Sequence, residues 1–359
     1  MFLPTVKKSF HLRQNISKKL DFFVPVVEVK RLEGLKQVQV RSISVITTTL
    51  NEEQNIEGWL YALLEQSLSP QEVVICDGGS TDATVNLIKK WKHDHPKLKV
   101  ILVSSPGANI AKGRNEAMRE STGDVLLFSD VGSVPDKEWV KELSAPFLSD
   151  LFATVSLGVS ESSSNSSLAR AVCKLILPEI SEINPATYLA SARSIGVSRE
   201  VFINVGGFPE HLTFAGEDTL FNLKIREFTK SGFYFSDKAI AKWIPPKSFL
   251  QLWRMLFRYA KGDAEAGNFY REYLSRITEL SSIIIGLGLA LYCFYYAILR
   301  SQFGVLLIVA VAFYFAASPL VAYRNRLKEF GIKEQFLAPF ILISAQASGF
   351  ISGLYSSKE

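Results

Sequence analysis

The chain has 359 residues, of which 48% are hydrophobic and 21% charged, and its formal net charge is +5. This length fits one large α/β domain with an appendage, or two domains, and the small basic excess suits contact with anionic lipid or phosphate groups. No dense basic stripe occurs, so no nucleic acid is expected as a partner. The three cysteines are far apart and match neither a disulfide framework nor a metal site.

Residues 1–40 are predicted to form a basic amphipathic leader. Lysine and arginine are mixed there with phenylalanine and leucine, and no apolar run is long enough for a signal peptide. The leader is expected either to lie in a membrane interface or to pack loosely on the domain that follows.

The next segment alternates between two patterns. Short β-branched runs predict strands at 42–48, 72–76, 99–104 and 125–129, with helices between them at about 53–66, 82–92 and 109–120. This strict alternation predicts a doubly wound, mainly parallel sheet with helices on both faces. Ligands of such sheets bind beyond the carboxyl ends of the strands, so the loops after those ends are the expected site.

The chain is less regular from residue 151 onward. Strands are predicted at 152–160 and 194–198, a polar loop at 161–167, and a helix beginning near Glu217. Residues 247–279 are predicted to form amphipathic helices at a membrane interface.

The end of the chain is apolar. Residues 280–299 and 303–323 are each long enough to cross a bilayer, and the tight link Arg300–Gln302 joins them as a hairpin. A third apolar segment, 336–355, is weaker because it contains polar residues. The link before it carries four basic residues, which places that link, and with it the region before residue 280, on the cytoplasmic side.

The first two loops are rich in polar residues. In Thr47–Glu53, Asn51 is suited to cap the next helix, and neither a dinucleotide-binding glycine motif nor a P-loop lysine is present. In the second loop, Asp77 stands at a strand end, where a carboxylate accepts hydrogen bonds from a nucleobase edge, and Gly79 allows close backbone approach. A plain turn with a helix cap is the alternative interpretation of this loop.

The other two loops carry opposite charges. Lys112 and Arg114 are cations placed where a diphosphate would bind, although surface cations of this kind are often only solvated. Asp130 follows a buried apolar strand and is a suitable ligand for Mg²⁺ or Mn²⁺, which prefer oxygen ligands.

Taken together, Thr-Leu-Asn-Glu-Glu (49–53), Asp-Gly-Gly-Ser-Thr-Asp (77–82), Gly-x-x-x-Ala-x-Gly-Arg-Asn (107–115) and Phe-Ser-Asp-Val-Gly (128–132) resemble the family 2 glycosyltransferases of GT-A fold. The resemblance implies that Asp77 contacts the nucleotide base and that Glu53 lies nearby. It also implies that Asp130 begins the Asp-x-Asp metal motif of the family. Gly132 replaces the second acid of that motif, so Asp130 is expected to be the protein ligand from this loop.

The resemblance continues at Gly-Gly-Phe-Pro-Glu (206–210) and Gly-Glu-Asp-Thr (216–219). It implies that Asp218 is the general base of an inverting transfer and that Glu217 supports it. Acids at a helix N-terminus also stabilise the helix dipole, so a structural role is the alternative. Gln251-Leu252-Trp253-Arg254 resembles part of the Gln-x-x-Arg-Trp motif of processive members, and Met255 in place of its Trp predicts transfer of single sugars.

These features predict an inverting, non-processive hexosyltransferase that uses a UDP- or GDP-linked sugar, a divalent cation and a lipid-linked or glycolipid acceptor at the membrane. Its domain would span 41–246 and its membrane segments 280–355. The predicted donor-binding residues are Thr48, Asn51, Glu53, Asp77, Gly79, Lys112, Arg114, Asp130, Gln251 and Arg254. The alternatives are a non-catalytic membrane scaffold of GT-A fold and a sugar nucleotidyltransferase.

Overall fold

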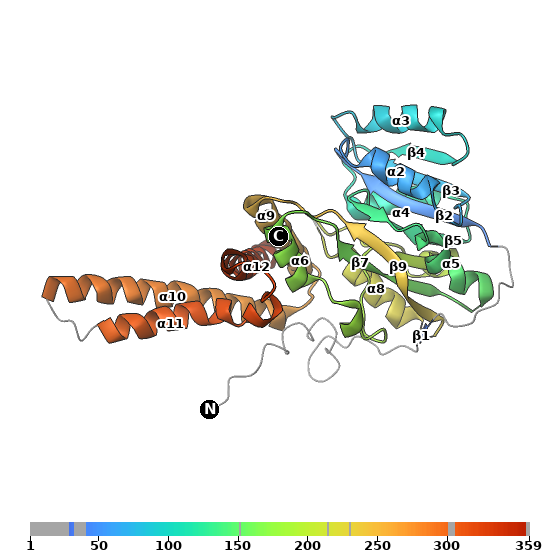
Figure 1. The fold of residues 1–359 in the computed structure, drawn as a ribbon. Coiled ribbons are helices and arrows are strands. Elements are labelled where there is room, and N and C mark those ends of the chain that lie inside the picture. The colour runs from blue at the N-terminus through green and yellow to red at the C-terminus, as the bar shows by residue number, and fades with distance from the viewer. Residues whose placement is uncertain are drawn as a thin grey trace. The chain divides into compact units, whose positions relative to one another are not determined.

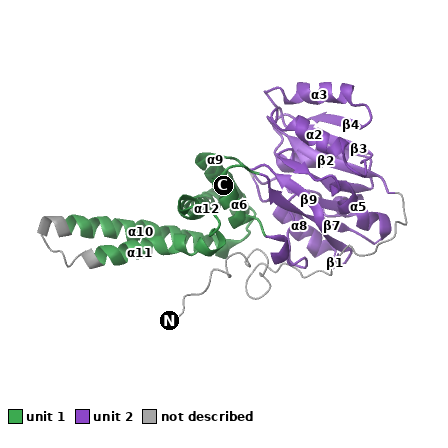
Figure 2. Ribbon diagram, in the orientation of Figure 1, with its two compact units in different colours: residues 1–12, 164–178, 246–359 green, residues 13–163, 179–245 purple. Residues whose placement is uncertain are grey.

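The computed structural model describes residues 29–31, 41–150, 152–213, 215–229, 231–300 and 306–356 (Figure 1). The chain divides into two compact units (Figure 2). The α/β unit comprises residues 13–163 and 179–245, and the helical unit comprises residues 1–12, 164–178 and 246–359. Apart from residues 29–31, the predicted leader lies outside the described residues.

The α/β unit is built on one nine-stranded sheet in the order β1-β9-β7-β8-β5-β2-β3-β4, with β6 paired to β9. The strands are β1 (Val29–Arg31), β2 (Ile43–Thr49), β3 (Glu72–Asp77), β4 (Val100–Ser104), β5 (Val125–Phe128), β6 (Ser133–Pro135), β7 (Val155–Ser162), β8 (Ile195–Ser198) and β9 (Phe233–Trp243). Strands β2 to β5 are parallel, as predicted, whereas β8 is antiparallel to both of its neighbours. The sheet is therefore mixed but mainly parallel.

Helices cover both faces of this sheet (Figure 1). They are α2 (Ile56–Leu64), α3 (Thr84–Asp94), α4 (Ile110–Glu120), α5 (Trp139–Ser149), α7 (Arg199–Asn204) and α8 (Glu217–Phe228), with a short 3-10 turn η2 (Ile180–Glu182). Alternate strand residues enter different cores. Val45, Ile75 and Leu127 pack with α2, α3 and α5, whereas Ile46 and Phe128 pack with α4, α7 and α8. This two-residue period confirms the predicted doubly wound arrangement.

The direction of β8 brings a further segment to the carboxyl edge of the parallel strands. Phe128, at the end of β5, pairs with Ile195, at the start of β8. The residues that follow β5 and those that precede β8 therefore lie at the same edge of the sheet.

A buried carboxylate joins three segments at the opposite edge. Glu72 is fully buried at the start of β3, where it accepts hydrogen bonds from Ser44 Oγ (2.8 Å), Thr122 N (2.5 Å) and Lys99 Nζ (2.8 Å). Burial raises the pKa of Glu72, but the hydrogen bonds from Lys99, Thr122 and Ser44 outweigh it and lower the pKa from 4.5 to about 2. The ionised carboxylate thus stabilises the first half of the sheet.

Replacing Glu72 by glutamine is expected to destabilise the α/β unit by about 3 kcal/mol at pH 7, because the lowered pKa corresponds to that much stabilisation. The stabilisation is fully present above pH 4.5 and is lost as the pH falls toward about 2. Thermal unfolding of the detergent-solubilised chain should show a lower midpoint for Glu72→Gln at pH 7 and a shrinking difference below pH 4.5. A difference that stays constant from pH 7 to pH 3 would contradict this explanation.

The helical unit consists of α6 (Ser167–Ile176), α9 (Phe249–Glu265), α10 (Tyr270–Arg300), α11 (Leu306–Val321), the 3-10 turn η4 (Arg324–Arg326) and α12 (Ile332–Ser356). Glycines allow close packing of α12 on α9, because a side chain at Gly349 would lie 2.2 Å from Phe257 O and one at Gly353 2.4 Å from Lys261 O. Helix α6 joins the same core through buried residues. They are Ala169, Ala171, Val172 and Leu175.

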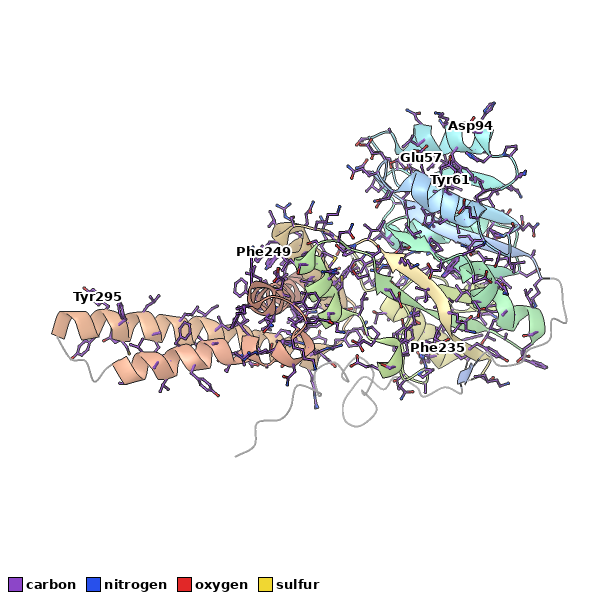
Figure 3. The ribbon with its side chains drawn as sticks, viewed as in Figure 1. Glu57, Tyr61, Asp94, Phe235, Phe249 and Tyr295 are labelled. Atoms are coloured by element: carbon purple, nitrogen blue, oxygen red, sulfur yellow. The ribbon has the colours of Figure 1, made fainter. Side chains whose placement is uncertain are left out.

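Helix α10 exposes large apolar side chains along much of its length. Tyr295 (Figure 3) is 63% exposed. The others include Ile284, Ile285, Leu287, Leu289, Leu291, Tyr292 and Phe294. A single apolar side chain at the surface is ordinary, whereas a continuous set of this kind is typical of a surface that contacts a membrane or another protein.

Two helices in the described residues are long and apolar enough to cross a membrane, at Tyr270–Tyr296 and Ile332–Ser356. They contain most of the first predicted span, 280–299, and the third, 336–355. The second predicted span, 303–323, overlaps α11, of which the structure describes the 16 residues Leu306–Val321. Residues 301–305, which include part of the predicted link, lie outside the described residues.

Candidate active site

The first two loops at the carboxyl edge are joined by side chains. Asn51 has a left-handed backbone (φ 56°), and its Oδ1 accepts a hydrogen bond from Thr81 N at 2.9 Å. Glu53 accepts one from Ala83 N at 3.0 Å. The loop after β2 and the loop after β3 therefore form one rigid wall, and the side chains of Asn51 and Glu53 contribute to it.

Asp77 ends β3 and is only 4% exposed. Its carboxylate accepts hydrogen bonds from Gly79 N (3.0 Å) and Ser80 N (3.0 Å), so it shapes its own loop. Gly79 has φ 101°, and a side chain there would approach Pro106 Cα to 3.2 Å. Two features thus require glycine at this position: its positive φ and the close approach of the next loop.

Arg114 connects two loops at the centre of the edge. Its side chain is 3% exposed, and its guanidinium donates hydrogen bonds to Asp130 Oδ1 (2.6 Å) and Glu217 Oε1 (2.7 Å). The guanidinium also lies 5.1 Å from the centre of the Phe208 ring. Arg114, predicted from sequence as a donor-binding cation, is here directed at two carboxylates.

The charges in this cluster shift one another. Burial lowers the pKa of Arg114, but Asp130 and Glu217 outweigh burial and raise it. Burial raises the pKa of Asp130, but Arg114 and Arg193 outweigh burial and hold it below its usual value. The pKa of Glu217 is raised by burial and by the neighbouring Asp218, with Arg114 opposing them. Asp130 is therefore ionised at neutral pH.

Glu217 and Asp218 begin α8 and differ in surroundings. Glu217 is buried against Arg114, whereas the side chain of Asp218 is half-buried and accepts a hydrogen bond from Thr219 N at 2.8 Å. Gly216, just before them, has φ 88°, which glycine tolerates and which turns the chain into the helix. Asp218 is the more accessible acid of the pair.

The Gly-Gly-Phe-Pro-Glu segment is held by Asn115, a residue that the sequence placed only within a motif. Asn115 Nδ2 donates to Phe208 O (2.9 Å), and Asn115 Oδ1 accepts from Phe208 N (2.9 Å). Gly207 has φ 68°, and a side chain there would lie 2.6 Å from Asn115 Oδ1. The motif therefore fixes the chain that leads into α8.

Arg193 is a site residue that the sequence-based predictions missed. Its Nε lies 3.8 Å from Asp130 Oδ2, and its guanidinium lies 4.4 Å from the centre of the Trp243 ring. Its position follows from the sheet register, because Arg193 stands two residues before Ile195, the partner of Phe128. Predicting β8 as antiparallel is the signal that would have found it.

The remaining predicted donor-binding residues lie in different places. Thr48 donates from Oγ1 to Cys76 O (3.0 Å), and Lys112 is half-exposed and lies 3.8 Å from Glu116. Gln251 and Arg254 belong to α9 in the helical unit, so their part in the site stays a prediction.

Asp130 fits a divalent cation that receives most of its ligands from a substrate. Mg²⁺ typically keeps several waters and uses one or two carboxylates together with substrate phosphates. Among the described residues no group of three acidic, histidine or cysteine side chains is arranged so that it could hold a metal ion. Asp130, one-third exposed at the strand end, is suited to such a cation, and a second carboxylate from this loop is excluded by Gly132.

The family model for Glycosyl transferase family 2 matches residues 44–187. Among curated proteins, the chain is 27% identical over 228 residues to poly(ribitol-phosphate) beta-N-acetylglucosaminyltransferase TarS of Staphylococcus aureus, a match that covers 59% of this chain and 39% of the relative. It is 24% identical over 246 residues to glycosyltransferase AglE of Haloferax volcanii, covering 68% of this chain and 80% of the relative. The chain thus spans about two-fifths of the first relative.

A solved structure shares the fold. The mannosyltransferase PcManGT of Pyrobaculum calidifontis, in complex with GDP-Man and Mn²⁺, superposes with a TM-score of 0.57 at 17% sequence identity, covering 98% of this chain and 95% of that one. This likeness confirms the predicted GT-A-type architecture.

Proposed function

Because the model of glycosyl transferase family 2 matches residues 44–187, we propose that the chain transfers one sugar from a nucleotide-sugar donor to a membrane-associated acceptor, with inversion at the anomeric carbon. The observation that carries the proposal is the Arg114 bridge, which holds Asp130 and the Glu217–Asp218 pair at one edge of the sheet. A group suited to a diphosphate-bound cation and a candidate base therefore act on the same substrate.

The donor would bind against the wall formed by the first two loops. Asp77 would accept hydrogen bonds from the base, because each carboxylate oxygen can accept more than one hydrogen bond. Asn51, Glu53 and Thr48 would keep the wall rigid. Lys112 would add positive charge to this side.

The transfer would be a direct displacement. Asp218 takes the proton of the acceptor hydroxyl while that oxygen forms a bond to the anomeric carbon. The bond from the anomeric carbon to the diphosphate oxygen breaks, and the nucleoside diphosphate leaves with the electron pair. A Mg²⁺ or Mn²⁺ ion at Asp130 would supply charge neutralisation. The mannosyltransferase of similar fold was solved in complex with GDP-Man and Mn²⁺. Glu217 would hold Asp218 in place through the N-terminal turn of α8.

The acceptor would be lipid-linked or a glycolipid. This part of the proposal is supported by α10 and α12, which are long and apolar enough to cross a membrane. The basic link between α11 and α12 favours a cytoplasmic position for the α/β unit. Helix α9, with Gln251 and Arg254, would lie at the interface. The proposed limits of the transferase domain are residues 41–246.

The first test is nucleotide binding by the purified chain in detergent. UDP, GDP and CMP are titrated by calorimetry with Mn²⁺ and with EDTA. One diphosphate is expected to bind with Mn²⁺, and Asp77→Asn is expected to weaken its binding at least about 10-fold through loss of charge-assisted hydrogen bonds. Folding of the variant is checked by its thermal midpoint. No binding of any nucleotide by folded protein would favour a non-catalytic scaffold instead.

A further inference from the structure

We propose that Arg193 binds the diphosphate of the donor directly, so that this arginine and the cation at Asp130 share the charge of the leaving group. The inference rests on the proposed function and adds a residue to its site. It concerns a phosphate contact that does not depend on the metal.

The sheet register fixes Arg193 beside the cation ligand. β5 and β8 are antiparallel, with Val125 opposite Ser198 and Phe128 opposite Ile195. Continuing this register by two residues places Asp130 opposite Arg193. The observed distance of 3.8 Å between Arg193 Nε and Asp130 Oδ2 agrees with that placement. Any diphosphate held through a cation at Asp130 would therefore come within reach of the guanidinium.

Trp243 orients the guanidinium. The indole is 6% exposed, it lies 4.4 Å from the guanidinium carbon, and it is fixed by strand pairing with Ser133. Stacking of this kind costs an arginine none of its hydrogen-bond donors, because these point outward in the plane of the group. The side chain of Arg193 is 12% exposed, so it is held in place before any ligand arrives.

The segment that carries Arg193 is anchored to α8. Asn222 Nδ2 donates to Ala190 O (2.9 Å), and Arg226 donates to Ala186 O (2.7 Å) and Tyr188 O (2.7 Å). Arg226 is fully buried, and burial lowers its pKa to about 10. Helix α8 thus carries Asp218 at its start and anchors the segment before Arg193 through Asn222 and Arg226. This arrangement keeps the distance between the candidate base and Arg193 constant.

The guanidinium of Arg193 favours a phosphate as the ligand. Gly132 removes one carboxylate from the loop, and Arg193 adds one cation beside the carboxylate that remains. Arginine presents several N–H donors in a planar fork that matches two phosphate oxygens. A bound diphosphate would either replace Asp130 as an ion-pair partner of Arg193 or contact Arg193 together with Asp130.

The test is calorimetric titration of the nucleoside diphosphate that binds, and of its monophosphate, in EDTA and in Mn²⁺. Wild type is expected to retain measurable diphosphate binding in EDTA. Arg193→Ala should weaken that binding about 10- to 100-fold, the usual effect of losing hydrogen bonds to a charged group, with a smaller loss for the monophosphate. Arg193→Lys should be intermediate, since it keeps the charge and loses the fork.

Arg119→Ala is the matched control, because Arg119 lies on α4 and its side chain is 60% exposed. Its ion pair in the described part of the chain is with the surface residue Glu210, at 3.6 Å. This variant should bind like wild type. Equal losses for monophosphate and diphosphate, or unchanged diphosphate binding by folded Arg193→Ala and Arg193→Lys, would overturn the role of Arg193. In both cases the wild-type protein still binds the nucleotide in Mn²⁺, whereas failure of the proposed function would mean that the wild-type protein does not bind it in Mn²⁺ either. An effect confined to the KM for the acceptor would also overturn the inference.

Discussion

Replacing Asp218 by asparagine is expected to lower kcat by about 10²- to 10⁴-fold, the usual contribution of a general base. Asparagine has nearly the same shape and still accepts the hydrogen bond that Thr219 N gives to Asp218, so α8 should keep its start. Affinity for the nucleoside diphosphate should stay within about threefold, because the base acts on the acceptor. Turnover is measured as diphosphate release from the donor in the presence of a polyprenyl phosphate or lipid-linked sugar.

Glu217→Gln serves as the matched comparison. Its amide oxygen still accepts a hydrogen bond from Arg114, and the residue is buried, so the loss in kcat should be smaller than for Asp218→Asn. The reverse order of the two effects would move the base to Glu217. An Asp218→Asn enzyme with kcat near that of wild type would exclude Asp218 as the base.

Replacing Arg114 by methionine is expected to destabilise the α/β unit by about 3–5 kcal/mol, the range seen when one partner of a buried ion pair is removed. Two carboxylates then lose their shared cation while one of them stays buried. For a unit of this size the thermal midpoint should fall by roughly 10 °C. The measurement is thermal unfolding in detergent at pH 7, followed by circular dichroism.

The double variant Arg114→Met/Glu217→Gln separates charge from packing. Removing the buried carboxylate should recover part of the lost stability, because the penalty comes mainly from an unpaired charge. Arg119→Met is the surface control on the same helix and should change the midpoint little. If the double variant is as unstable as the sum of the two single variants, the ion-pair explanation is wrong.

The first half of the sheet was predictable because its signals are local. Strands β2 to β5 and helices α2 to α4 lie within a few residues of their predicted limits, since hydrophobic periodicity decides them. The edge at which Asp77 and Asp130 gather followed from the parallel order alone. The family resemblance was confirmed for the same part of the chain.

The second half depends on pairing between distant segments. β9 was not predicted, because Ser236–Lys238 interrupt its apolar run and the register between β7 and β9 shifts at that point. Helix α5 contains Pro146, which a sequence pattern treats as a break. Arg193 was not predicted for a related reason, because only the antiparallel direction of β8 makes it a neighbour of Asp130.

Helix α6 lies within the sequence of the α/β unit but belongs to the helical unit. Its apolar residues Ala169, Val172 and Leu175 are buried in one hydrophobic core with residues of α9 and α12. A chain cut before Pro246 would keep α6 but lose α9 and α12, so the apolar side chains of α6 would be exposed to solvent. We therefore expect a fragment without the C-terminal helices to stay soluble only when α6 carries polar substitutions as well.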